Sequence, residues 1–334
     1  MTTVGCIGGG QLGRMLGLAG LSLGLSFRFL DPSPDACAQE VGELVVAPYD
    51  DPDALSRLAA GAEVVTYEFE NVPVEAAASV GALPGPGALE HGQDRLREKE
   101  LFRSLGIPTA RFGSLEEAGL PALVKTRRLG YDGKGQRRVD APERLGDGEL
   151  AEAVVDFERE LSIVGVRGRD GETRFWPVSD NIHLDGILRV TRAPAPNAPQ
   201  REAEEICTAL LDALDYVGVL AVELFEVAGR LLANEYAPRV HNTAHWTIDG
   251  AETSQFENHL RAILGLPLGG TAALAPCVMV NLIAAVPPLD KLLALHGAHV
   301  HLYGKEPRPG RKLGHVTLVG PGEEVVERLM ALAG

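Results

Sequence analysis

The sequence predicts an α/β fold at the N-terminus, joined to regions of α+β character. Over the first 80 residues, short apolar strand-like segments alternate with helix-like segments, which is typical of a parallel sheet. From Trp176 onward, a larger region holds a hairpin and a helix-like segment at about residues 254–264. The chain has 334 residues, too many for one core, so two or three domains are expected at roughly 100–200 residues each.

Four strands are predicted in the N-terminal unit. The first, at residues 4–7, runs into a glycine turn at residues 8–13 and a helix at residues 14–23. The other strands lie at residues 26–30, 44–47 and 63–67, with a second helix at residues 53–60. The unit ends near residues 84–87, where two prolines and two glycines mark a loop.

The middle of the chain starts with a charged helix at residues 94–105, which Gly106 and Pro108 terminate. A short strand at residues 123–125 follows. Residues 151–155 and 160–166 are predicted to be strands of a small second sheet, and a late strand is expected at residues 300–305.

Composition excludes several classes of protein. The apolar fraction of 45% indicates a globular chain, and the net charge of −15 argues against a nucleic-acid-binding surface. The four cysteines form no Cys-x-x-Cys pair, so we expect no zinc site and a reducing compartment. No apolar run reaches the roughly 20 residues that cross a bilayer, and no basic leader with an apolar core is present, so we expect a cytoplasmic protein without membrane contact.

The turn at residues 8–13 fits the pattern G-x-G-x-x-G, after a strand and before a helix. Asp31 ends the second strand, where a ribose-binding acid stands in dinucleotide folds. Taken alone, these features favour NAD binding. The alternative is a tight strand–helix turn that binds no ligand, because glycines also allow close backbone packing.

Lys125 ends a short strand and precedes a loop rich in glycine and charge, at residues 130–136. Glycines let backbone N–H groups approach phosphate oxygens, and lysines neutralise them. The loop lacks the G-K-[ST] of a P-loop. We interpret it as a lid over a triphosphate, with a mobile surface hairpin as the alternative.

A hairpin at residues 221–237 carries Glu223 on one strand and Glu235 on the other. A three-residue turn at residues 228–230 would place the two glutamates opposite each other on one face. Facing carboxylates repel unless a divalent cation lies between them. A two-residue turn would instead put them on opposite faces, and the hairpin would then be an ordinary solvated one.

Basic and amide residues follow the hairpin, namely Arg239, His241, Asn242 and His245. Arg239 offers a fork for phosphate or carboxylate, whereas His245, beside Trp246, has a packed core residue as its alternative interpretation. A later basic cluster holds Lys305, Arg308, Arg311 and Lys312. In an acidic chain it fits a phosphate clamp, and a solvated charged turn is the alternative.

In combination, these motifs resemble the ATP-grasp superfamily and, within it, the 5-(carboxyamino)imidazole ribonucleotide synthase family, the ATP-dependent carboxylases of bacterial purine synthesis. The matching segments are residues 8–15, 67–72, 130–136, 181–183, 234–242 and 254–257. The resemblance implies a three-domain ATP-grasp fold with an N-terminal parallel α/β domain at residues 1–93, a central lid at 94–175 and a C-terminal domain at 176–334. It also implies a homodimer.

The resemblance implies roles for individual residues. ATP binding is expected from Arg95, Lys125, Gly130, Tyr131, Asp132, Gly133, Lys134, Gly135, Gln136, Glu152, Ala153, Val154, Val155, Glu160, His183, Asn234 and Glu235. Glu223 and Glu235 would hold Mg²⁺ or Mn²⁺. The ribonucleotide is expected at Gln11, Glu70, Arg239, His241, Asn242, Thr243, Lys305 and Arg311, with Tyr131 and Asp132 beside it. Tyr131, Asp132, Lys134 and His241 are the expected catalytic residues, and either Asp132 or His241 would assist proton removal.

The implied reaction uses ATP and bicarbonate to form carboxyphosphate, which carboxylates 5-aminoimidazole ribonucleotide. A close alternative is another ATP-grasp ligase, such as a formate-using purine transformylase. A distant alternative is an NAD-dependent dehydrogenase, which would leave the paired glutamates and the glycine-rich loop without a role. A third is a nucleotide sensor that binds ATP without turning it over.

Overall fold

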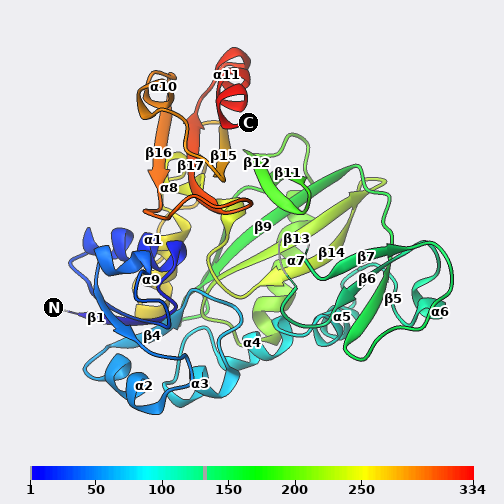
Figure 1. Cartoon of the computed structure of the whole chain (residues 1–334), viewed down its shortest axis with the longest axis horizontal. Helices are drawn as coiled ribbons and strands as arrows, with labels where there is room; N and C mark the ends of the chain where they lie inside the picture. Colours follow the sequence, from blue (N-terminus) through cyan, green and yellow to red (C-terminus); the bar gives the residue numbers. More distant parts are fainter. Residues whose placement is uncertain (1, 131–133) are drawn as a thin grey trace.

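The computed structural model describes residues 2–130 and 134–334. Within these ranges the strands form three sheets, two of four strands and one of nine. The N-terminal sheet lies at one end of the molecule and the sheet of β5 to β8 at the other, with the nine-stranded sheet between them and extending above the N-terminal sheet (Figure 1). The mixed α/β class predicted from the sequence is confirmed.

The N-terminal sheet is parallel, with strand order β3-β2-β1-β4, as the alternating pattern predicted. Its β1 strand continues through the glycine turn into helix α1. In helix α2, a proline at the first position sets the backbone φ to a helical value. The elements are β1 (Thr3–Ile7), α1 (Gln11–Leu21), β2 (Ser26–Asp31), η1 (Cys37–Glu40), β3 (Glu43–Val46), α2 (Pro52–Ala59), β4 (Val64–Tyr67) and α3 (Val74–Ser79).

Two helices lead from this unit to the small sheet. They are α4 (Pro86–Gly92) and α5 (Arg95–Ser104), and the side chain of Asp94 caps α5 by accepting from the Leu96 N–H. The small sheet has the order β5-β8-β6-β7, with a core of short apolar side chains. Its elements are β5 (Phe112–Gly113), α6 (Leu115–Ala118), β6 (Ala122–Thr126), β7 (Gln136–Val139) and β8 (Glu149–Ala153).

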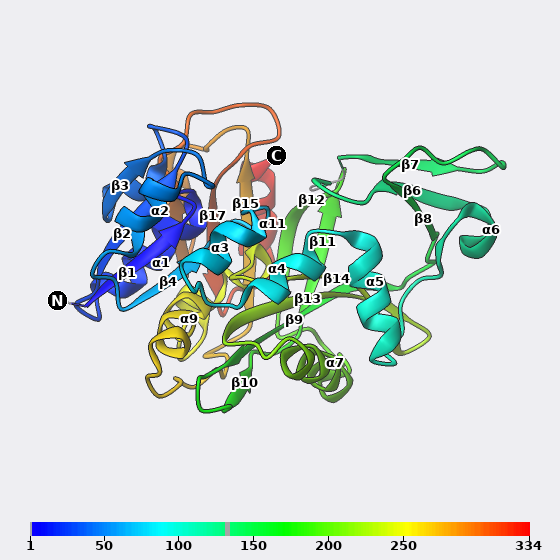
Figure 2. The same cartoon turned by 90° about the horizontal axis from the view of Figure 1, so that it is seen from below.

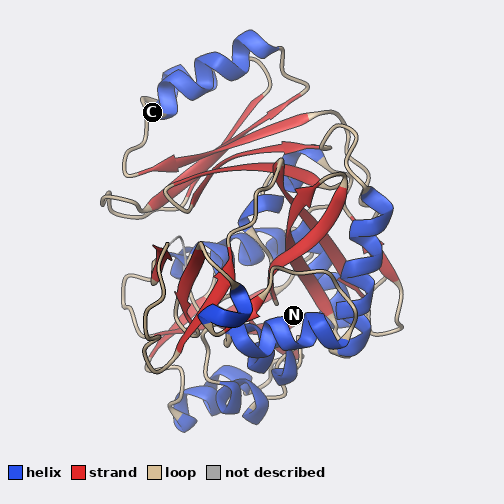
Figure 3. Cartoon of the chain, turned by 90° about the vertical axis from the view of Figure 1, so that its right-hand side faces the viewer, coloured by secondary structure: helices blue, strands red, loops and turns tan. Residues whose placement is uncertain are grey.

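The large sheet is antiparallel throughout and runs β14-β13-β9-β11-β12-β15-β17-β16, with β10 added beside β9. Helix α11 lies across its C-terminal strands, where Val326 and Leu329 are buried (Figure 3). The elements are β9 (Arg159–Arg167), β10 (Thr173–Phe175), β11 (Ser179–Leu184), β12 (Ile187–Ala193), α7 (Gln200–Ala213), β13 (Gly218–Val227), β14 (Arg230–Ala237), η2 (Asn242–Ala244), α8 (Thr247–Gly250), α9 (Gln255–Leu264), β15 (Cys277–Ile283), α10 (Leu289–Leu293), β16 (Ala298–Leu302), β17 (Lys312–Val319) and α11 (Glu323–Ala333).

One strand lies in a different sheet from the one predicted. Strand β9 was expected in the small sheet, but it pairs with β13 on one side and β11 on the other in the large sheet. Residues 161–166 are buried, and the small sheet has too little apolar surface to cover such a run. We therefore propose that the central domain ends in the segment 154–158, which joins β8 to β9, rather than at residue 175.

The N-terminal unit is packed firmly against the large sheet. Side chains of α1 and β2 share one core with Phe256 and Leu260 of α9, and α1 and α9 lie side by side (Figure 2). This core fixes the glycine turn relative to the C-terminal strands. None of the helices in the described ranges has the length and apolar character needed to span a lipid bilayer.

Candidate active site

The glycine turn between β1 and α1 is occupied by the protein's own carboxylates. The Glu68 carboxylate, just after β4, accepts hydrogen bonds from the Gly10 N–H (3.0 Å) and the Gly13 N–H (3.3 Å). A Cβ added at Gly8, whose φ is 102°, would lie 2.7 Å from Glu68 Cγ. The glycines therefore allow Glu68 to approach the N-terminus of α1, where a negative charge is favoured.

Asp31 also faces inward. Its carboxylate accepts from the Gly9 N–H (2.8 Å), the Ser33 N–H (2.8 Å) and the Tyr49 hydroxyl (3.2 Å). A dinucleotide site needs free backbone donors at the turn and a free acid for the ribose. Both are engaged by other parts of the chain, so the geometry disfavours the NAD alternative.

The β13–β14 hairpin has a shorter turn than predicted. Val227 pairs with Arg230, so the turn consists of Ala228 and Gly229 alone, with φ of 49° and 72°. Positive φ at both positions is typical of the two-residue turn that matches the twist of paired strands. The expected three-residue turn is therefore wrong, and the short turn alone would put the two glutamates on opposite faces.

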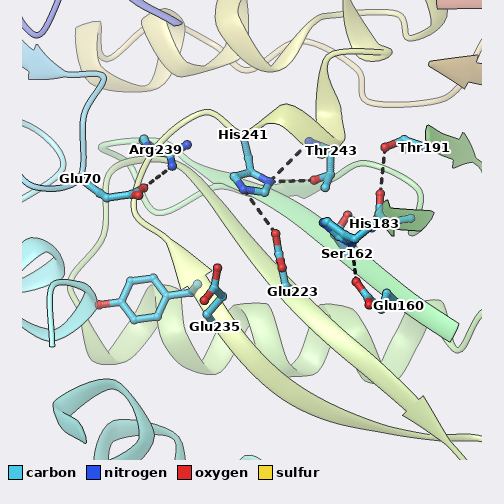
Figure 4. A network of polar contacts seen from close by, with 12 residues as sticks. Glu70, Glu160, Ser162, His183, Thr191, Glu223, Glu235, Arg239, His241 and Thr243 are labelled. Atoms are coloured by element: carbon cyan, nitrogen blue, oxygen red, sulfur yellow. Dashed lines mark hydrogen bonds and ion pairs between the residues drawn. The ribbon is translucent and has the colours of Figure 1, made fainter. Parts of the chain in front are cut away.

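A β-bulge reverses that outcome. The pairing shifts by one residue between Glu223 and Leu224, and Asn234 is the extra residue on β14. Glu223 therefore pairs directly with Glu235, on one face of the sheet. The predicted juxtaposition is confirmed, although the bulge and not the turn produces it. Figure 4 shows the two carboxylates on neighbouring strands.

The two glutamates have opposite electrostatic surroundings. Burial and the negative charge of Glu235 raise the pKa of Glu223 to about 7. Burial also acts to raise the pKa of Glu235, but Arg95, which donates to its Oε2 at 2.8 Å, holds that pKa below its usual range. The side-chain Oδ1 of Asn234 is buried and accepts no hydrogen bond from residues 2–130 or 134–334.

This oxygen-rich set fits a hard divalent cation. Mg²⁺ uses one or two carboxylates together with substrate phosphates, and Glu223, Glu235 and Asn234 offer two carboxylates and an amide oxygen. In the described residues no group of three or more His, Cys, Asp and Glu side chains has the arrangement of an all-protein metal site. A metal held here would therefore depend on ligands from the substrate.

A small, narrow cavity lies beside Glu223 and Asn234. His183 from β11 forms an ion pair with Glu160 from β9 on its wall (Figure 4). Burial opposes protonation of His183, but Glu160 and Glu223 outweigh it and raise its pKa. Beneath the cavity Asn181 bonds to Ser162 (3.0 Å) and Thr191 (2.9 Å), which fixes β11 against its neighbours. The lining residues are Glu160, Leu161, Asn181, His183, Glu223, Leu224, Phe225 and Asn234.

Lys125 and Glu152 from the small sheet face the same region. Lys125 Nζ donates to Glu152 Oε2 at 2.9 Å, so the carboxylate of Glu152 is directed at lysines, and its backbone lies between strands β5 and β6 of the small sheet. Ala153 ends β8, and Val154 and Val155 begin the joining segment as half-buried residues. Gly130, Gly135 and Gln136 flank the turn before β7, with Lys134 between them. The predicted roles of Tyr131, Asp132 and Gly133 lie outside the described residues.

A larger hollow is lined by Glu235 and lies on the other side of the hairpin residue Asn234 from the small cavity. There Arg239, in the loop after β14, forms an ion pair with Glu70 of the N-terminal unit (Figure 4). Its lining residues include Glu70, Arg95, Gly130, Glu235, Arg239 and His241. The hollow therefore lies where the N-terminal unit, α5 and the hairpin meet.

His241 connects the two sides of the site. Its Nε2 lies 3.6 Å from Glu223 Oε1, and its Nδ1 is 3.0 Å from the Thr243 hydroxyl. Gln255 holds the backbone of His241 at both its N–H (2.8 Å) and its C=O (2.6 Å). Burial and the Arg239 charge lower the pKa of His241 well below its usual range, which keeps the imidazole neutral.

The remaining predicted ribonucleotide residues are not among those that line the larger hollow. Lys305 Nζ contacts Gln11 at the start of α1, and burial lowers the pKa of this lysine. Arg311 is held by the Glu306 carbonyl at 3.0 Å. Both side-chain polar atoms of Asn242 are buried without a hydrogen-bond partner in the described part of the chain, so this amide is available to bind a ligand.

Sequence reasoning missed Glu68, Lys99 and Gln255. Glu68 and Gln255 stand inside segments that carry the resemblance, so only their roles were overlooked. Lys99 belongs to a helix predicted as simply charged, but its side chain is buried and donates to the Asn234 carbonyl. Alternation of charge along that helix gave no signal that one of its lysines faces inward.

Known protein families match each of the three parts of the chain described above. Residues 1–93 match the ribonucleotide synthetase preATP-grasp domain, residues 101–256 the ATP-grasp domain, and residues 277–329 the phosphoribosylaminoimidazole carboxylase C-terminal domain. N5-carboxyaminoimidazole ribonucleotide synthase from Pseudomonas aeruginosa is 50% identical over 337 residues, 94% of each chain. The chain belongs to the N5-carboxyaminoimidazole ribonucleotide synthase family. It is an enzyme, an ATP-dependent ligase, and the predicted ATP-grasp fold is confirmed.

Solved structures of N5-carboxyaminoimidazole ribonucleotide synthases agree with the fold. The enzyme from Thermus thermophilus is 53% identical, with a TM-score of 0.94 over 98% of both chains. The enzyme from Aspergillus clavatus, solved in complex with ADP and 5-aminoimidazole ribonucleotide, is 29% identical, with a TM-score of 0.90 over 99% of this chain and 98% of that one.

Proposed function

We propose that this chain carboxylates 5-aminoimidazole ribonucleotide with ATP and bicarbonate, through carboxyphosphate, in purine synthesis. The main supporting observation is that strand β14 and the loop after it contribute residues to both the smaller cavity and the larger hollow. Glu223 and Asn234 line the smaller cavity, whereas Glu235, which pairs with Glu223, lines the larger hollow together with Arg239 and His241. ATP would occupy the first side and the ribonucleotide the second.

In the first step a bicarbonate oxygen attacks the γ-phosphorus of ATP, and the bond to ADP breaks. Lys125 and Arg95 would bind the phosphates and stabilise the charge that develops during transfer. Mg²⁺ or Mn²⁺ held by Glu223 and Glu235 supplies further neutralisation of the phosphate oxygens when bound. These residues also keep the triphosphate in line with the larger hollow.

In the second step the exocyclic amine attacks the carboxyl carbon of carboxyphosphate, or CO₂ released from it, and inorganic phosphate leaves. The amine loses one proton as the carbamate forms. Asp132 and His241 are the two candidate bases that would accept it. Closure of the glycine-rich loop would exclude water from the labile intermediate.

The test measures ADP release with each substrate omitted in turn. We expect release to require both bicarbonate and the aminoimidazole ribonucleotide. Turnover that is indifferent to the ribonucleotide refutes the assignment, and turnover that needs formate instead of bicarbonate supports a transformylase. A homodimer also remains our expectation, and sedimentation of the purified protein tests it.

A further inference from the structure

Helix α5 covers the free edge of strand β14 at the position of Glu235. Strand β14 is the last strand on its side of the sheet, so its outer N–H and C=O groups have no neighbouring strand. On the covered stretch these groups bond to α5 and the segment after it. Glu98 Oε1 accepts from the Tyr236 N–H at 2.7 Å, and the Pro108 carbonyl accepts from the Ala233 N–H at 2.7 Å.

Lys99 lies at the centre of these contacts and is fully buried. Its ammonium group donates to the Asn234 carbonyl (2.7 Å) and to the Thr109 hydroxyl (3.0 Å). The third partner is Glu152 Oε2, at 3.4 Å. An ammonium group has three donors, and each of them has a partner here. A buried lysine with all its donors engaged is held in one orientation.

Thr109 binds the backbone of the residue that precedes Asn234. Its hydroxyl accepts from Lys99 and donates to the Ala233 carbonyl at 2.7 Å. In a regular strand the carbonyls of adjacent residues point to opposite edges. At the bulge, the carbonyls of Ala233 and Asn234 both meet this one pair of side chains. The Lys99–Thr109 pair therefore recognises the bulged backbone and not a regular strand.

The two peptide groups that flank Glu235 are thus both anchored to α5. Lys99 holds the carbonyl before it and Glu98 the N–H after it, while Arg95, one turn earlier on the same helix face, holds its carboxylate. If the bulge relaxed into regular pairing, Glu235 would turn to the opposite face of the sheet. The direction of this side chain depends on the bulge staying in place.

We propose that Lys99 is a positioning residue that, with Thr109, fixes the bulge at Asn234 and so keeps Glu235 directed at the metal beside the ATP phosphates. The proposal rests on the metal role given to Glu235 under the proposed function. Lys99 also links this strand to the small sheet, because Glu152 bridges it to Lys125 of β6. Lys99 therefore supports both Glu235, expected to bind the metal, and, through Glu152, Lys125, expected to bind the nucleotide.

The test compares metal affinity with nucleotide affinity in the full-length enzyme. Mn²⁺ binding to the ADP complex is followed by electron paramagnetic resonance, and ADP binding is measured separately in EDTA. We expect Lys99→Met to weaken Mn²⁺ binding about 10- to 100-fold, the range seen when support of a metal ligand is removed. ADP affinity in EDTA should fall by less than Mn²⁺ affinity, because Lys125 keeps its own contact with Glu152 (2.9 Å) when Lys99 is replaced.

A matched pair at Thr109 keeps the test decisive if Lys99→Met does not fold. Thr109→Val removes the hydroxyl at nearly constant volume and should weaken Mn²⁺ binding several-fold, whereas Thr109→Ser should restore it. Arg97→Met, on the exposed face of α5, is the control and should leave both affinities unchanged.

The proposal is overturned if Lys99→Met or Thr109→Val lowers the midpoint of thermal unfolding but leaves Mn²⁺ affinity within twofold of wild type. Absence of Mn²⁺ binding by the wild-type ADP complex overturns it as well. Failure of the carboxylation assignment is a different result, seen as ADP release that ignores the ribonucleotide, and Mn²⁺ binding to the ADP complex does not depend on that reaction.

Discussion

The carboxylates at the glycine turn and at the hairpin differ in what they face. Glu68 accepts two backbone hydrogen bonds at the N-terminus of α1, which favour its charge, although burial outweighs them and raises its pKa. Glu223 faces a second carboxylate, that of Glu235, and its pKa is raised to about 7. The glycine motif is therefore filled by a side chain of the protein itself, whereas the paired carboxylates of the hairpin suit a divalent cation.

The largest effect should come from removing one carboxylate of the pair. Glu235→Gln is expected to slow ribonucleotide-dependent ADP release about 1,000-fold, since losing a metal-binding charge costs on the order of 4 kcal/mol of transition-state stabilisation. Glu324→Gln, on the exposed surface of α11, is the control. A Glu235→Gln variant that keeps more than a tenth of wild-type turnover contradicts the metal role.

His259 joins the two regions and gives a pH dependence. The Val219 N–H of β13 donates to its Nδ1 (3.1 Å), so Nε2 carries the hydrogen that bonds Thr66 of β4 (2.9 Å). Burial lowers its pKa to about 4, against about 6.5 in the unfolded chain. The stabilisation is therefore complete above pH 6.5 and is lost as the pH falls toward 4, by about 3 kcal/mol.

Urea unfolding at pH 7 and pH 4.5 of wild type and His259→Gln measures this contribution. The variant should lose less stability than wild type over that interval, because other buried histidines contribute equally to both proteins. Equal losses in the two proteins would show that His259 does not titrate in this range.

At the glycine turn, the expected effect is on folding and not on ligand binding. Glu68→Ala leaves the Gly10 and Gly13 N–H groups without their acceptor, which should lower the free energy of unfolding by about 2 kcal/mol. Glu68→Gln keeps an acceptor oxygen and should lose less. A gain of NADH binding by Glu68→Ala, measured by fluorescence, would show that this carboxylate had been blocking a dinucleotide site.

The smallest effect should come from the hairpin turn. Ala228 has a φ of 49°, in the left-handed region where a side chain is strained. Ala228→Gly should raise the free energy of unfolding by about 0.5 kcal/mol, since relief of strain is partly offset by the entropy of glycine. Destabilisation, measured by urea unfolding, would argue against the two-residue turn.

Local pattern predicted the parallel sheet and the start of α9 after its Ser254 cap, because these depend on neighbours along the chain. The facing glutamates were predicted too, but from a turn of the wrong length. It failed where contacts come from far away. Nothing near residues 160–166 indicates that β9 joins the large sheet, and the acceptor for the Gly13 N–H lies 55 residues further along the chain. The bulge at Asn234 was missed because it is held by Lys99, 135 residues earlier.

The bulge also constrains how this hairpin can change length during evolution. Eleven residues separate Glu223 from Glu235, and with a two-residue turn one of them must stay unpaired for the glutamates to face each other. Loss of the bulged residue alone would leave ten, and the regular pairing that joins Leu224 to Ala233 would then continue directly to Glu223 and Glu235. The strand pairing therefore tolerates a single deletion at Asn234, and a sequence alignment should place a one-residue gap in this hairpin there and not in the turn.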